Sequence, residues 1–218
     1  MKSTQGDYRK LRLRNLNSPE FSHLKLLLGW GLYFVLYSLT ERLIPETACH
    51  VVHCALDDKI PFCEYFAFFY AGWYFLIAAS LGYFLLRDVE SFRKLQIYII
   101  LVQLLATAVY ILWPTRHELR PDVIPRENVF SFVMALIYRI DTPTGVCPSL
   151  HVAISLGIAS VWLGRKGTGL WLKGLIALFC LGVCLSVAFV KQHSVVDIAA
   201  AIPLWLMAEW VAFYKFKC

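Results

Sequence analysis

Residues 170–190 read LWLKGLIALFCLGVCLSVAFV, an almost unbroken apolar run in which Lys173 is the single charge. A membrane-spanning helix needs about 20 predominantly apolar residues, and this run meets that length. Five further apolar runs of similar character occupy residues 24–40, 62–86, 95–113, 149–163 and 195–214. The pattern predicts six transmembrane helices joined by short polar segments.

Composition supports the same fold class. Of the 218 residues, 59% are hydrophobic and only 17% are charged, which is unlike an ordinary soluble domain. We therefore expect an all-α polytopic transmembrane bundle, with a basic N-terminal tail at residues 1–23 and a membrane domain at residues 24–218. The net charge of +6 does not indicate nucleic-acid binding, because the basic residues punctuate apolar runs instead of forming one patch.

The distribution of Lys and Arg predicts the orientation of the spans. With the N-terminus inside, 14 of the 21 basic residues fall on the cytoplasmic side. The other side then holds Arg42, Lys59, Arg116, Arg120, Arg126, Arg139 and Lys191. We expect both termini to be cytoplasmic and the long segment 114–147 to lie outside. Within that segment, residues 127–140 carry an apolar stripe and are expected to form an amphipathic helix on the membrane surface.

Three polar clusters fall at the predicted outer ends of the spans. They are PTRHELRP at 114–121, CPSLH at 147–151 and KQHSVVD at 191–197. His193 and Asp197 are four residues apart and would share a helix face, so the carboxylate would orient one imidazole nitrogen and leave the other free. Pro148 suits the first turn of a helix, whose free amides form an anion site.

Cations complete the predicted anion pocket. Arg120, Arg116 and Lys191 would offer positive charge to a tetrahedral anion, and Arg suits phosphate through paired hydrogen bonds. His23 and His117 are expected to be ordinary interface residues. Four cysteines fall in the predicted outer loops, namely Cys49, Cys54, Cys63 and Cys147. The sequence is compatible with a disulfide among them but does not determine its pairing.

These motifs resemble those of the membrane type 2 phosphatidic acid phosphatase superfamily. Residues 148–151, PSLH, resemble its Pro-Ser-Gly-His motif, His193-x-x-x-Asp197 resembles its closing motif, and Arg120-Pro121 resembles its opening Arg-Pro. Order, spacing and placement at span ends agree over the second half of the chain.

The resemblance implies a reaction without metal or cofactor that passes through a phosphohistidine. His193 would attack phosphorus, Asp197 would orient it, and His151 would serve as acid and then as base. Phosphate oxygens would be held by Arg120, Lys191, Ser149, the amide of Leu150 and Arg116. The expected site therefore lies at the non-cytoplasmic end of the bundle.

The chain departs from the family pattern at three places. Leu150 stands where Gly is usual, and the Ser-Arg pair expected before His193 reads Ser186-Val187. Trp113 stands where a lysine is expected before Arg120. These departures suggest a divergent branch and weaken the assignment of the cations more than that of the two histidines and the aspartate.

The expected function is hydrolysis of a phosphomonoester or diphosphate of a lipid. A close alternative is transfer of a phosphorylated headgroup onto ceramide or diacylglycerol, as in sphingolipid synthesis. A non-enzymatic transporter of an anionic solute is the alternative from another class. A transporter predicts polar residues along several spans, whereas the middles of these runs are apolar.

Overall fold

The computed structural model describes residues 7–215 of the chain. Lys2 and Lys217, counted above among the basic residues, lie outside the described residues. The described chain is all-α apart from two two-residue strands. Its helices are α1 (Leu28–Leu43), α2 (Ala67–Arg87), α3 (Val89–Leu112), α4 (Val129–Ile140), α5 (Leu150–Gly164), α6 (Leu170–Phe189) and α7 (Val195–Glu209).

Within residues 7–215, four segments are long and apolar enough to cross a membrane. They are Glu64–Arg87, Val89–Leu112, Leu170–Phe189 and Val195–Phe213. This result agrees with an integral membrane protein. The other two predicted spans are shorter as α-helices, since α1 has 16 residues and α5 has 15. The segment expected to open the first span instead forms a 3₁₀ helix at Ser22–Leu27.

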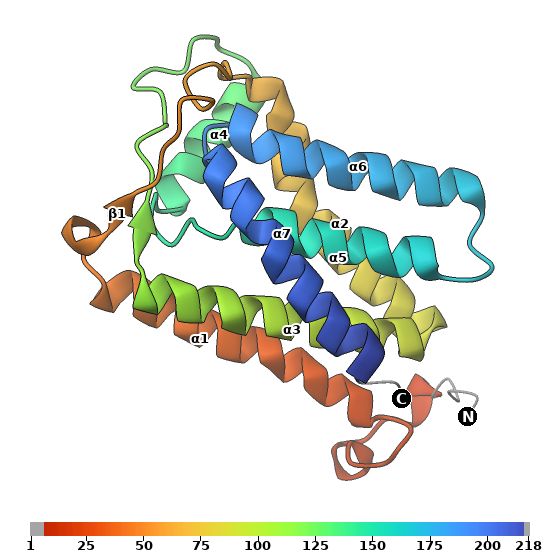
Figure 1. The fold of residues 1–218 in the computed structure, drawn as a ribbon. Helices are drawn as coiled ribbons and strands as arrows, with labels where there is room; N and C mark the ends of the chain where they lie inside the picture. The colour runs from red at the N-terminus through yellow and green to blue at the C-terminus, as the bar shows by residue number, and fades with distance from the viewer. Residues whose placement is uncertain (1–6, 216–218) are drawn as a thin grey trace.

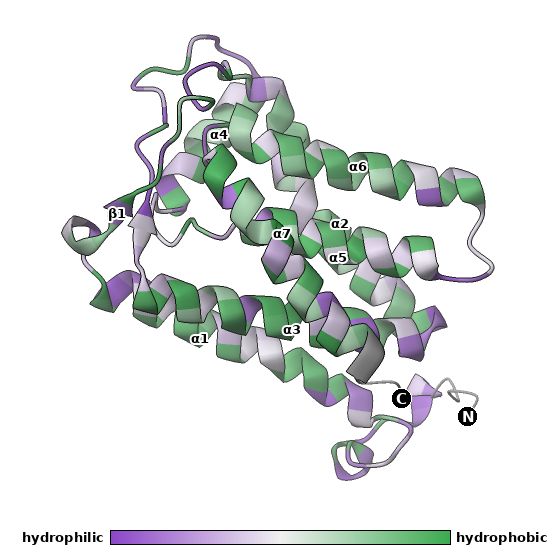
Figure 2. Cartoon of the chain, viewed as in Figure 1, coloured by the Kyte–Doolittle hydropathy of each residue, from purple (hydrophilic) through white to green (hydrophobic). Residues whose placement is uncertain are grey.

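The longer helices run back and forth between two ends of the bundle, and α4 lies at one of these ends (Figure 1). The end that carries α4 also carries β1 (His50–Val51), which pairs in parallel with β2 (Thr115–Arg116). The described chain begins and ends at the opposite end of the bundle. Hydrophobic residues dominate the long helices, while hydrophilic ones gather at the two ends (Figure 2).

Side-chain caps fix where several helices begin. Asp88 accepts a hydrogen bond from the amide of Ser91 at the start of α3, and Asn128 accepts from the amides of Phe130 and Ser131 at the start of α4. Such caps satisfy amides that the first turn leaves without partners. The predicted helix at 127–140 is confirmed as α4, shorter by two residues.

α5, one of the two shorter predicted spans, is the central helix of the bundle. α5 packs against α2, α3, α6 and α7, and most of its residues are buried. A helix that is apolar all round belongs in the interior of a bundle. Gly157 permits this packing, because a Cβ there would meet the Tyr98 ring of α3 at 2.0 Å. The first turn of α5 therefore presents His151 to the protein interior.

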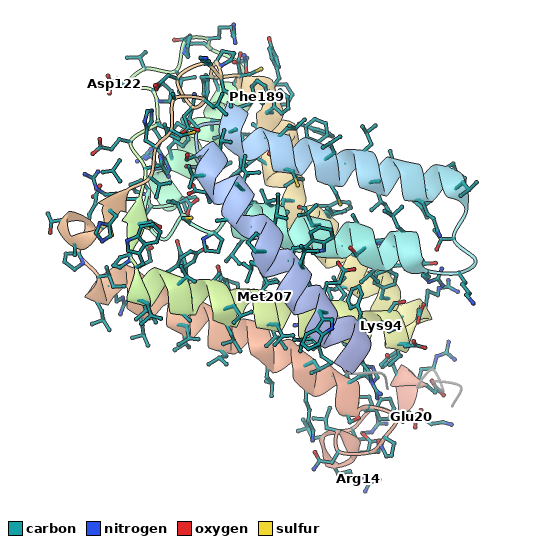
Figure 3. The ribbon with its side chains drawn as sticks, viewed as in Figure 1. Arg14, Glu20, Lys94, Asp122, Phe189 and Met207 are labelled. Carbon is teal, nitrogen blue, oxygen red and sulfur yellow. The ribbon has the colours of Figure 1, made fainter. Side chains whose placement is uncertain are left out.

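The N-terminal segment is part of the bundle where it is described. Phe21 and His23 are buried, and the Tyr8 hydroxyl lies 2.9 Å from His23 Nε2 and donates to the Leu85 carbonyl. The expectation that His23 is an interface residue is therefore wrong. Figure 3 shows Arg14, Glu20 and Lys94 at one end of the molecule and Asp122 at the other.

Candidate active site

His193 and Asp197 meet where α7 begins. The Asp197 Oδ2 atom lies 3.2 Å from His193 Nδ1 and accepts a 3.0 Å hydrogen bond from the Ser194 amide. Ser194 caps α7 in return, so the two residues form a capping box. One carboxylate oxygen thus caps the helix and orients the imidazole. Asp197 is fully buried, and its Oδ1 has no hydrogen-bond partner among the described residues.

Asp57, in the segment between β1 and α2, holds the start of α7 in place. Its carboxylate accepts hydrogen bonds from the Ser194 hydroxyl at 2.6 Å and from the Val195 amide at 2.8 Å. Burial would raise the pKa of Asp57, but these bonds and one from the Cys54 amide outweigh it, so the pKa is lowered. Asp57 therefore positions the start of α7. Sequence analysis missed it, because no motif marks an aspartate in a polar loop more than a hundred residues away.

His151 faces His193 from the first turn of α5. The two ring centroids are 5.6 Å apart, and the ring planes are inclined by 63°. His151 stacks on Tyr70 of α2, with centroids 4.4 Å apart, and contacts the tilted ring of Trp73 of α2 at 4.2 Å. Its Nε2 atom is buried and has no hydrogen-bond partner in the described chain. His151 in the first turn of α5 and His193 in the segment just before α7 therefore lie close together, as expected from the sequence.

The start of α5 differs in detail from the prediction. α5 begins at Leu150 with Ser149 as its N-cap, so Pro148 precedes the helix instead of occupying its first turn. The Ser149 amide is not free, because it donates to the Asp197 carbonyl at 3.1 Å. This bond joins the two motif segments directly. The Ser149 hydroxyl is buried without a partner among the described residues, and Leu150 lines the adjoining cavity.

Arg120 lies beside the histidine pair, but most of its hydrogen-bonding capacity is already used. Its guanidinium donates to Gln192 Oε1 at 2.7 and 3.0 Å, and to the carbonyls of Tyr138 and Asp141. It also stacks over the Tyr138 ring at 4.8 Å. Through Gln192, the neighbour of His193, Arg120 fixes the wall of the site. Four of its five N–H groups donate within the protein, so one is left for a ligand.

The structure does not bring Lys191 and Arg116 to the histidine pair. The Lys191 ammonium donates to the carbonyls of Asp57 and Ile60, so it is held by the segment between β1 and α2. Arg116 pairs with Glu118 at 2.5 Å. Both cations are therefore occupied elsewhere, in contrast to the anion pocket expected from the sequence.

A cavity of about 630 Å³ opens beside the two histidines. It lies between α1 and α2, and α1 packs mainly on α3. One part of its lining is polar and comprises Gln103, Asp141, Thr142, Thr144, His151, Gln192 and His193. The rest is largely aromatic and aliphatic and includes Trp30, Tyr33, Phe34, Trp73, Ile77, Leu81 and Ile154. A cavity with these two surfaces suits an amphiphilic ligand.

Asp141 is a polar residue of this cavity that sequence analysis missed. Its carboxylate accepts from the Tyr37 and Tyr70 hydroxyls, each at 3.4 Å, and from Gln192 Nε2 at 3.2 Å. Burial raises the pKa of Asp141. The position of Asp141 in the sequence could have indicated this role. Asp141 directly follows the predicted amphipathic helix, on the predicted side of the three polar clusters.

His117 is buried next to the site and not at an interface, so that expectation is wrong. Its Nδ1 accepts from the Leu119 amide at 3.2 Å, while its Nε2 has no partner in the described chain. Burial, assisted by positive charge at His193 and Arg120, lowers the pKa of His117 to about 3. The cysteines at 49, 54, 63 and 147 are all free thiols.

Comparisons with protein-family models, curated protein sequences and solved structures give no match to this chain. The fold and the site define an all-helical protein with membrane-spanning potential and a buried His–His–Asp cluster.

Proposed function

We propose that this chain is an integral membrane enzyme that transfers a phosphoryl group from a lipid phosphate through a phosphohistidine at His193. The observation that carries the proposal is the His–His–Asp cluster at the wall of an amphiphilic cavity. The 5.6 Å between the ring centroids lets both imidazoles contact one phosphoryl group. The Asp197 contact at Nδ1 would leave Nε2 of His193 as the nucleophile.

Each step of the reaction has a residue to perform it. Nε2 of His193 attacks phosphorus while the bond from phosphorus to the lipid oxygen breaks. Protonated His151 gives its proton to that oxygen, so the lipid alcohol leaves. Neutral His151 then takes a proton from water, whose oxygen attacks phosphorus and breaks the bond to Nε2. Phosphate leaves, and both histidines return to their starting states.

Charge on the phosphoryl oxygens requires donors that are already in place. The Ser149 hydroxyl, which lacks a partner among the described residues, is one such donor. The amides of Leu150 and His151 at the start of α5 are two more, because first-turn amides have no intrahelical partner. Arg120 adds its remaining N–H group and its positive charge.

A lipid substrate is supported by the shape and the chemistry of the cavity. Its aliphatic and aromatic walls would hold acyl chains while the phosphate lies at the histidines. We propose that α1, α2, α3, α5, α6 and α7 all cross the membrane, since they run between the same two ends (Figure 1). The charge distribution then puts both termini in the cytoplasm and the active site on the other side.

A second function, transfer of a phosphorylated headgroup onto ceramide or diacylglycerol, is favoured by a specific observation. Lys191 and Arg116 are bound to other groups, and a carboxylate lines the cavity. This environment is less positive than the two charges of a phosphomonoester require. In that reaction an alcohol takes the place of water at the phosphohistidine, and His151 accepts its proton.

A panel of lipid phosphates in mixed micelles, assayed with EDTA present, tests the proposal. We expect wild type to release phosphate or to move a headgroup onto an added lipid alcohol, and His193→Ala to lose both activities. His53→Ala is the matched control, because His53 is an exposed histidine that also pairs with an aspartate. Full turnover by His193→Ala would exclude the phosphohistidine. Movement of an anionic solute across the membrane without formation of a phosphorylated protein would favour a transporter.

A further inference from the structure

The carboxylate of Asp141 forms no ion pair with a described side chain, although Arg120 and His193 act on it electrostatically at longer range. Arg120 donates to the backbone carbonyl of Asp141 and not to its carboxylate. The three groups that do contact the carboxylate are neutral, at 3.2 to 3.4 Å. A half-buried carboxylate held by long neutral hydrogen bonds would be stabilised by a cation bound directly beside it.

Aromatic rings surround the same part of the cavity. Tyr33 and Tyr37 line it from α1, with their centroids 6.0 Å apart. Trp73 and Tyr74 line it from α2, with their centroids 5.0 Å apart. The faces of such rings attract cations, and ring clusters of this kind bind quaternary ammonium groups. The carboxylate and the rings together form a site suited to an organic cation.

Tyr70 and Gln192 connect this cation site to the two histidines that would hold the phosphorus atom. The Tyr70 hydroxyl donates to Asp141, and the Tyr70 ring stacks on His151 at 4.4 Å. Gln192 also donates to Asp141 and directly precedes His193. A ligand that reaches from the histidines to Asp141 must therefore join a phosphate to an ammonium by a short arm. The headgroups of zwitterionic phospholipids have that composition.

We propose that Asp141 and the rings of Tyr33, Tyr37, Trp73 and Tyr74 bind the ammonium of a phosphocholine or phosphoethanolamine headgroup. The inference rests on the phosphohistidine chemistry proposed above and specifies its substrate as a zwitterionic phosphodiester. A phosphomonoester would bring only negative charge next to the carboxylate, which is unfavourable.

The transferred group follows from this substrate. The bond between phosphorus and the diacylglycerol oxygen breaks, the bond to His193 Nε2 forms, and His151 protonates the departing diacylglycerol. A lipid alcohol or water then gives its proton to His151 and bonds to phosphorus, while the bond to Nε2 breaks. The headgroup leaves on the new oxygen with its ammonium unchanged.

The test compares substrates in detergent micelles that contain a labelled lipid alcohol as acceptor. Phosphatidylcholine, phosphatidylethanolamine and phosphatidate are assayed separately with wild type, Asp141→Asn and Asp58→Asn. Asp58 is an exposed aspartate whose carboxylate pairs with His53, so its substitution serves as the matched control. We expect wild type to have a higher kcat/KM for at least one of the two zwitterionic lipids than for phosphatidate. Asp141→Asn should lower kcat/KM for the zwitterionic lipids about 10- to 100-fold, chiefly by raising KM.

A second measurement keeps the inference testable if Asp141→Asn folds poorly. Tetramethylammonium should inhibit wild type competitively against the phospholipid, and Tyr37→Phe should still be inhibited because the ring face is kept. Preference of wild type for phosphatidate, or no competition by tetramethylammonium, would overturn the ammonium site. Turnover of any lipid by His193→Ala would instead refute the phosphohistidine on which the inference rests.

Discussion

Replacement of Asp197 by Asn isolates the electrostatic role of this carboxylate from its structural role. A single oxygen, Oδ2, contacts both the Ser194 amide and His193 Nδ1. The Asn oxygen in that position would keep both hydrogen bonds, including the one that supports the start of α7. The negative charge that stabilises a positively charged imidazole would be lost, so the phosphohistidine would form more slowly.

The expected magnitude follows from this loss of charge. Removal of one charge from a buried pair costs about 3–5 kcal/mol. Each tenfold loss of rate corresponds to about 1.4 kcal/mol of activation free energy, so kcat should fall by about 10²- to 10³-fold. Asp197 is fully buried, so solvent does not replace the lost charge. The structural effect should be small, because the capping bond is retained.

Single-turnover kinetics with a labelled lipid substrate would measure this cost. The reaction is stopped at neutral or alkaline pH, because phosphohistidine is acid-labile. We expect almost no phosphoenzyme from Asp197→Asn and an unfolding temperature within a few degrees of wild type, while Asp58→Asn matches wild type in both. Retention of at least a tenth of the wild-type rate by Asp197→Asn would refute the role of the Asp197 charge in activating His193.

Three further predictions concern packing, pH and metals. Gly157→Val should destabilise the bundle by about 1–3 kcal/mol or more, because the valine side chain would overlap the Tyr98 ring. Gly31→Ala is the control and should not destabilise it, because no atom lies within 4 Å of the added Cβ. Equal melting temperatures of the two variants in detergent would contradict the packing of Gly157 on Tyr98. His117 has a pKa of about 3 in the folded chain against an ordinary value of 6.5, so the unfolded chain binds more protons and stability should fall as pH drops from 6.5 towards 3. His117→Gln should flatten this dependence in urea titrations at pH 4 to 7, and an unchanged slope would contradict the buried neutral imidazole. Prolonged dialysis against EDTA should leave turnover unchanged, whereas recovery of lost activity by added Zn²⁺ or Mg²⁺ would show that a metal takes part.

The residues of the candidate site differ in how far the sequence alone could predict them. His151, His193 and Asp197 were predicted together from their motifs. The shared helix face expected for His193 and Asp197 is wrong, because α7 begins at Val195 and His193 contacts Asp197 from the turn before the helix. Arg116 and Lys191 were predicted as phosphate ligands on charge alone. Charge does not say which partner a long side chain reaches, and both reach other groups.

The sequence by itself determined the all-α class, the apolar helices and the capping box at the start of α7, because these depend on contacts within a few residues. Only the tertiary structure decided that α5 is the central buried helix, and that Asp141 and the rings of α1 and α2 share a cavity with the histidines. Such meetings depend on how helices distant in sequence pack together. A carboxylate between Tyr37 and Tyr70 leaves no periodic or spaced pattern along the chain, so only the folded arrangement reveals it.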